Sequence, residues 1–203
     1  MAGITSKTQI GNTALILLGQ PTVNDIDAPG SNHKAAVIGG FYDMARQYTL
    51  RAGTWRFALT RANIARDTGI PKHSWNYQYK IPEDVMLLHQ VGTDDDPLTV
   101  NRDYKIEGGY ILTNAEGSLP IVYVGDVTDT SLMPPDFALA TASILASFGA
   151  PPILQSTDKA AEMLKLHEYY LKMAGTNNAL ENAPRIINNS RWRDSQRTLQ
   201  VVR

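Results

Sequence analysis

The stretch TWRFALTR, residues 54–61, decides the fold because the spacing of its apolar residues differs from that of the chain before it. Upstream, apolar residues recur every three or four positions, which predicts helices. From Trp55 the period becomes two, and Trp55, Phe57 and Leu59 alternate with Arg56, Ala58 and Thr60. This alternation predicts a strand that begins at Trp55 with one face buried. We interpret Trp55 and Phe57 as fold-defining core residues, and the arginines as facing solvent or a neighbouring subunit.

Two helices are predicted before this stretch. Residues 6–9, SKTQ, have the form of a capping box, and Gly19 marks the end of the first helix. The second helix starts at Ser31 and fades near residue 51. It contains Gly39 and Gly40, each of which costs roughly 1 kcal/mol relative to alanine. We expect another backbone to approach closely there, from the same chain or from a neighbouring subunit, so both glycines are candidate subunit-interface residues.

The segment 57–132 is predicted to be mostly antiparallel β structure. Further short strands are expected at Tyr77–Ile81, Met86–Val91, Asp103–Ile106, Gly109–Thr113 and Pro120–Val124. Glu107-Gly108-Gly109 is typical of a hairpin turn. Trp75, Tyr77 and Tyr79 alternate along one strand. They favour a packed core or a subunit interface over a base-stacking platform, which a neutral chain does not support.

Helical patterning returns after Met133. The run DFALATASILASFGA, residues 136–150, is apolar on most sides and predicts a helix buried on several faces, ended by Gly149 and the following prolines. A last helix, capped by Thr157 or Asp158, carries an apolar stripe that includes His167, which we interpret as a core or interface histidine. No stretch approaches the roughly 18 consecutive apolar residues of a membrane span.

These patterns predict an α+β fold in three parts. Residues 1–56 and 133–180 form an antiparallel helical bundle, residues 57–132 form an antiparallel β module inserted into it, and residues 181–203 form an extended basic C-terminal tail. Residues 185–203 hold five arginines against one aspartate and one aromatic residue, too little apolar surface to fold alone. The tail could be a solvated end, contact DNA phosphates, or dock on an acidic partner surface. Trp192 between two arginines favours docking.

Composition excludes several kinds of chemistry. The 203 residues carry 19 basic and 20 acidic side chains, a net charge of −1. The chain as a whole therefore lacks the net positive charge that favours binding to DNA or to an anionic membrane. The absence of cysteine excludes disulfides and thiol catalysis. The four histidines lack metal-ligand spacing, and the acidic run Asp94–Asp96 is typical of a solvated turn. We see no nucleophile elbow, phosphate loop or leader peptide, and we expect no catalytic residue, metal or cofactor.

An ordered set of segments resembles a known family. The segments are NTALILLGQPTVNDID (12–27), FYDMARQYTLRAGTWRFALTRANIA (41–65), WNYQYKIPEDVMLL (75–88), YKIEGGYILTN (104–114) and VYVGDVTDTSLMPPDFALATASILAS (122–147). Together they resemble the tail tubular protein A family, the head-to-tail adaptors (connectors) of short-tailed bacteriophages. The resemblance covers roughly residues 8–180.

The resemblance implies a helical bundle with a β insertion, assembled as a homo-oligomeric ring that is commonly a dodecamer. Such a ring lies between the portal protein and the tail nozzle or tail tube protein, closes the packaged head and conducts DNA during ejection. The C-terminal segment of the family reaches the portal. The corresponding portal-docking candidates in this tail are Arg185, Arg191, Trp192, Arg193, Arg197 and Arg203.

The sequence therefore predicts a structural virion protein without enzymatic activity, found in the neck or tail and in the host cytoplasm during assembly. Phage DNA would pass through the lumen without sequence-specific binding, and no membrane is involved. Three alternatives stay open: a virion-associated hydrolase of cell wall or polysaccharide, a DNA-binding module, and an adaptor of a long-tailed phage.

Overall fold

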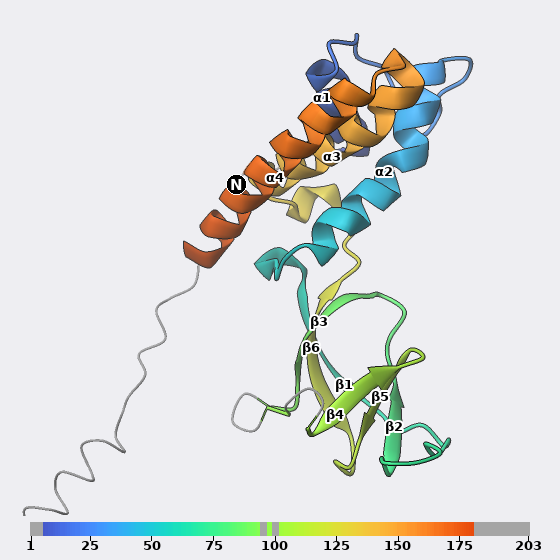
Figure 1. Cartoon of the computed structure of the whole chain (residues 1–203), viewed down its shortest axis with the longest axis vertical. Helices are drawn as coiled ribbons and strands as arrows, with labels where there is room; N and C mark the ends of the chain where they lie inside the picture. The colour runs from blue at the N-terminus through green and yellow to red at the C-terminus, as the bar shows by residue number, and fades with distance from the viewer. Residues whose placement is uncertain (1–5, 94–96, 99–101, 181–203) are drawn as a thin grey trace, which may run out of the picture.

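The computed structural model describes residues 6–93, 97–98 and 102–180. Within them the fold is α+β, as predicted, with four α-helices and two small antiparallel sheets. The helices are α1 (Lys7–Leu17), α2 (His33–Arg51), α3 (Pro135–Leu154) and α4 (Thr157–Leu180). The strands are β1 (Leu59–Ile64), β2 (Tyr77–Lys80), β3 (Val85–Val91), β4 (Tyr104–Glu107), β5 (Tyr110–Thr113) and β6 (Leu119–Gly125). The helices gather at one end of the molecule and the strands at the other (Figure 1).

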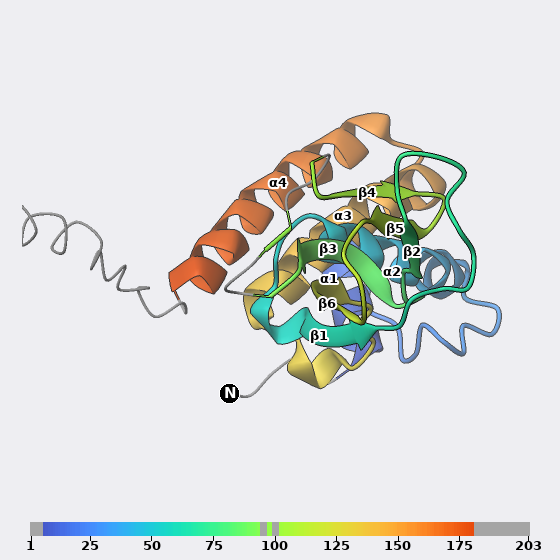
Figure 2. The same ribbon diagram turned by 90° about the horizontal axis from the view of Figure 1, so that it is seen from below.

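The strands form two three-stranded sheets, ordered β1-β6-β3 and β2-β5-β4. Tyr79, Ile111 and Ile121 belong to a hydrophobic core that both sheets share, and Figure 2 shows the sheets beside one another. The five later strands occur where the sequence predicted them, with small shifts at their ends. The predicted hairpin is confirmed: Gly108 and Gly109 have φ of 57° and 82°, which a two-residue turn between β4 and β5 requires.

The prediction that β1 begins at Trp55 is wrong. Residues Arg56–Ala58 form a 3₁₀ turn, η1, closed by a hydrogen bond from the Ala58 amide to the Trp55 carbonyl. The strand starts only at Leu59, where Val124 of β6 lies opposite and can complete the ladder. Before that point Phe137 of α3 lies alongside instead, so the backbone has no strand with which to pair.

Helix α3 is the centre of the helical part, in contact with α1, α2 and α4. In length and hydropathy it is the one helix of the described residues that could cross a membrane, which the sequence analysis did not expect. Most of it is buried in the structure, however, and a core helix has the same composition. The expected stop at Gly149 and the prolines is also wrong. Pro151 and Pro152 lie in the last turn, because the φ of proline is helical, and α3 ends at Gln155, whose φ is 54°.

The helix ends follow local hydrogen bonding. Ser6 Oγ accepts from the Gln9 amide, which is one half of the predicted capping box. Gly19 has φ of 68° and closes α1, as predicted, with the Gln20 amide bonded to the Leu15 carbonyl. The side chain that caps α4 is Ser156, which accepts from the Lys159 amide, and not Thr157 or Asp158. The prediction was one residue late because all three residues are good N-caps.

Candidate functional site

The helical and β parts meet at a buried ion pair that joins α2 to the end of β6. The Arg46 side chain is buried, and its Nη1 donates to the Asp126 carboxylate and, at 2.8 Å, to the Val127 carbonyl. Gln47 Nε2 donates to the other oxygen of Asp126 at 3.2 Å, and Asp43 lies 3.5 Å from Arg46 on the solvent side. This set of contacts connects two segments that are about eighty residues apart in sequence.

The protonation of Asp126 reflects this environment. Partial burial alone would raise the pKa of its carboxyl. The hydrogen bond and the positive charge of Arg46, with a further hydrogen bond from Gln47, outweigh burial and hold the pKa below its ordinary value. The carboxylate is therefore ionised at neutral pH and pairs with the buried guanidinium.

The last turns of α4 are tied to the same junction. Asn178 Nδ2 donates to the Thr54 carbonyl at 2.8 Å, and its Oδ1 accepts from the Arg56 amide at 2.9 Å. Trp55 is buried, donates from Nε1 to the Thr49 carbonyl at 2.9 Å, and meets Phe137 edge to face at 5.1 Å. Phe57 is half-buried and packs on the other side of the same ring, at 4.9 Å. The two aromatics thus lie where α2, α3, α4 and η1 meet.

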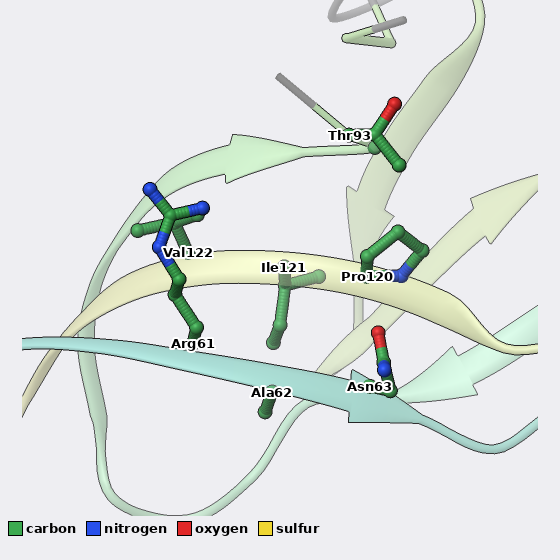
Figure 3. A pocket seen from close by; sticks show the side chains of 8 residues that line it. Arg61, Ala62, Asn63, Thr93, Pro120, Ile121 and Val122 are labelled. Atoms are coloured by element: carbon green, nitrogen blue, oxygen red, sulfur yellow. The ribbon is translucent and has the colours of Figure 1, made fainter. Parts of the chain in front are cut away.

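Two hollows flank the junction and the sheet. One, of about 580 Å³, lies between the end of α2, the strands and the end of α4, and its lining includes Arg56, Arg61 and His89. The other, of about 420 Å³, lies on the β1-β6-β3 sheet (Figure 3). There Arg61 and Asn63 of β1 and Thr93 after β3 are the polar side chains, placed over Pro120 and Val122 of β6. The linings of these two hollows contain no Asp or Glu, so neither hollow brings together the two carboxylates of a glycosidase.

The predicted interface residues have different positions in the structure. Trp75 is half-buried at a hollow beside β2, and Tyr77 is half-buried under the Arg66 guanidinium, 5.0 Å from its ring centre. Tyr79 is fully buried, and its hydroxyl donates to carbonyls of the loop that follows β5. Of the two predicted alternatives, a packed core or a subunit interface, Tyr79 belongs to the core, because its face of β2 points between the sheets.

The two glycines of α2 also separate. A Cβ at Gly39 would overlap the carbonyl oxygen of Ile26, so the expected backbone approach occurs there, within the chain. A Cβ at Gly40 would meet nothing within 4 Å, and this residue faces outward. What could pack against Gly40 depends on its neighbours on the same side of α2.

Exposed apolar side chains also occur on α2 and α4, which both pack on α3 (Figure 1). Met44 and Tyr48 of α2 and Leu164 of α4 are each 40–53% exposed. Phe148 and the buried His167 pack against Tyr48, with ring centres 6.3 Å and 5.7 Å from that of Tyr48. We call these five residues, together with Gly40 four positions before Met44, the α2–α4 face.

A second apolar surface lies on α4 itself. Tyr169, Met173 and Leu180 are 45–77% exposed and recur at helical spacing. Met173 is nine residues from Leu164, which places the two about 180° apart around the helix. We call Tyr169, Met173 and Leu180 the ridge face, since they project from the outermost helix on the side away from α2.

Sequence reasoning missed Arg46, which joins α2 to the end of β6, and Asn178, which ties α4 to the segment between α2 and β1. A signal existed for Arg46: it follows Ala45 on the buried side of α2, and a charge there needs a partner. Asn178 had no such signal, because its partners are backbone groups more than 120 residues away. The portal-docking candidates of the tail and Asp94–Asp96 lie outside the described residues.

Within the described ranges, no group of three His, Asp or Glu side chains is close enough to hold a metal ion. A scan of the chain against protein-family models finds no match, and a search of curated proteins finds no relative. The surface geometry and the resemblance of the sequence segments are therefore the basis for a functional proposal.

Proposed function

We propose that the chain is a structural subunit of a head-to-tail adaptor ring in a tailed bacteriophage, located between portal and tail nozzle. The observation that carries the proposal is the apolar surface of the helical part. Met44, Tyr48, Leu164, Tyr169 and Met173 are each about half exposed, on two sides of one group of helices. Large exposed apolar surfaces on a folded domain are typical of protein–protein contacts. The ordered segments described above resemble the adaptor family, and this resemblance supports that class of assembly.

The proposal includes the finer architecture. The four helices act as an antiparallel bundle that forms the body of the ring subunit, and the β part is an insertion that projects from it. The Arg46–Asp126 ion pair supports this division, because it fixes the end of β6 relative to α2. A fixed orientation is what each copy in a closed ring needs.

The ring is proposed to be a homo-oligomer, commonly a dodecamer in the family, whose lumen conducts DNA without sequence-specific contacts and without catalysis. Each phosphate contact adds affinity through counterion release, so a conduit that releases DNA should bind few phosphates. We therefore expect a lumen that is neutral or mildly acidic. A continuous lining of lysine and arginine in the assembled ring would contradict this expectation.

The tail is proposed to dock on the portal through its arginines and Trp192. Removal of residues 185–203 should leave the fold unchanged in circular dichroism and abolish co-sedimentation with the portal. A second variant replaces Trp192 alone by alanine. If Trp192 anchors the tail on the portal, this variant should dock at least about tenfold more weakly. Normal docking by the truncated protein would contradict the role of the tail.

The proposal is tested by electron microscopy of the purified protein, alone and mixed with its portal. A ring seated on one end of the portal is the expected result. The alternative function is that of a hydrolase. Release of fragments from purified peptidoglycan or polysaccharide would support that function instead. Salt-dependent gel shift that requires the tail would support the DNA-binding alternative.

A further inference from the structure

We infer that helix α4 is a pH-sensitive strap: protonation of His167 releases α4 from α3, while the other helices and the sheets stay folded. The inference does not depend on the proposed adaptor function. It is drawn from the contacts that hold α4 in place and from the surroundings of the two ring nitrogens of His167.

Helix α4 packs mainly on α3 and lies along the outside of the helical part (Figure 1). Side-chain hydrogen bonds tie it down at three levels. Near its start Ser147 Oγ donates to the Ala160 carbonyl at 2.9 Å, and near its end Asn178 bonds to the segment between α2 and β1. His167 lies between these two levels. A helix that packs on one neighbour can open as a unit at a lower free energy than the whole fold.

The hydrogen bond of His167 fixes which nitrogen carries the proton of the neutral ring. Nδ1 lies 2.8 Å from the Ala140 carbonyl of α3, and because a carbonyl oxygen only accepts, Nδ1 must be the donor. Nε2 then holds the lone pair. It is buried and has no hydrogen-bond partner among the residues that the structure describes. A second proton would therefore place an N–H and a positive charge at Nε2 with no acceptor to receive them.

The ionisable groups on the three helices around the ring do not compensate for that charge. On α2, Tyr48 lies with its ring centre 5.7 Å away, and Arg51, one turn further, is exposed. On α3 the only ionisable residue is Asp136, whose carboxylate is hydrogen-bonded near the end of α4. On α4 the exposed Glu168 favours the charged ring, but burial outweighs it and the pKa of His167 lies below its ordinary value.

Burial of Nε2 couples its protonation to the movement of α4. A proton from solvent reaches Nε2 only after α4 has separated from its neighbours, and the open ring then has an ordinary pKa of about 6.5. Protonation at pH 5 favours the open form by up to about thirtyfold relative to pH 8, the limit that applies when the closed ring takes up no proton. The Ser147 and Asn178 bonds carry no such dependence, so His167 is the contact along α4 that responds in this range.

The test is amide hydrogen exchange of the full chain at pH 8 and pH 5, read by mass spectrometry and corrected for the intrinsic effect of pH on exchange. Between the two pH values the opening equilibrium of α4 should rise between about fivefold and thirtyfold. Exchange in α1 and in the sheets should change by less than about twofold, because their contacts do not include His167.

Two variants separate protonation of His167 from other effects of pH. In His167→Gln the side-chain amide can still donate to the Ala140 carbonyl but takes up no proton, so the rise in α4 should disappear. His89→Gln is the matched control, because His89 is exposed on β3, and it should behave like the parent. The parent also supplies a readout that needs no variant: nitrogen NMR of the His167 ring should show the proton on Nδ1 at pH 8.

Three results would overturn the inference. The first is an equal rise of α4 exchange in the parent and in His167→Gln. The second is a rise of the same size in α4, α1 and the sheets, which would show that the whole fold opens together. The third is a neutral ring with its proton on Nε2, because the hydrogen bond to Ala140 would then be absent.

Discussion

Replacement of Asp126 by asparagine tests whether the ion pair with Arg46 holds the β part to the helices. The Arg46 side chain is 3% exposed and that of Asp126 is 23% exposed, so the pair is screened less than a surface pair but is not fully buried. Breaking a fully buried pair costs about 3–5 kcal/mol, and an exposed pair contributes about 0–1 kcal/mol. We expect Asp126→Asn to lower the free energy of unfolding by about 2 kcal/mol, or roughly 4–8 °C in Tm for a chain of this length.

The assay is urea unfolding followed by circular dichroism, with Asp43→Asn as the control. Asp43 is the other carboxylate near Arg46 but is largely exposed, so its loss should change the unfolding free energy by less than about 0.5 kcal/mol. The folded pKa of Asp126 lies below its unfolded value, so its contribution is present above the unfolded pKa and is lost as the pH falls through the folded pKa. The difference between parent and Asp126→Asn should therefore shrink below about pH 4. Equal stability of the two asparagine variants at pH 7 would refute the reasoning.

Four further substitutions test other positions. Gly39→Ala should destabilise the fold by more than about 1 kcal/mol, because the new Cβ would overlap the Ile26 carbonyl. Gly40→Ala should stabilise the monomer by about 0.5–1 kcal/mol. Chemical unfolding compares the two variants, and similar effects on the free energy of unfolding would contradict the close backbone approach at Gly39. Burial lowers the pKa of His167, so the unfolded chain binds a proton that the folded chain refuses, and stability should fall as the pH drops below about 6.5. His167→Gln should flatten that slope in urea midpoints, and an unchanged slope would exclude His167 as its source. Asn178→Ala should speed hydrogen exchange in the last turns of α4 without changing exchange in the sheets. If the exchange rate rises equally in α4 and in the sheets, Asn178 is not a local anchor.

The sequence was sufficient for most of the local structure. Helices, strands and the hairpin at Gly108-Gly109 follow from periodicity and turn chemistry, which act over a few residues. The errors lie where long-range contacts decide. Trp55 begins a 3₁₀ turn because Phe137, and not a strand, lies beside it. Pro151 and Pro152 continue α3 because their φ suits a helix whose other turns are already packed on three neighbours.

The candidate site was less accessible to sequence reasoning, because it depends on which helices become neighbours. Alternation alone could not distinguish Tyr79, which points into the core, from an interface residue on the same strand. Likewise the adjacent Gly39 and Gly40 are equivalent in sequence, and only the position of Ile26 shows that the first is used within the chain. The α2–α4 face joins residues from α2, α3 and α4 that no single segment predicts.

The most direct test of the central claim is electron microscopy of this protein bound to its portal. The account predicts a closed ring of copies of this chain, coaxial with the portal. Density for isolated monomers, or for copies placed anywhere other than the neck of the particle, would contradict it.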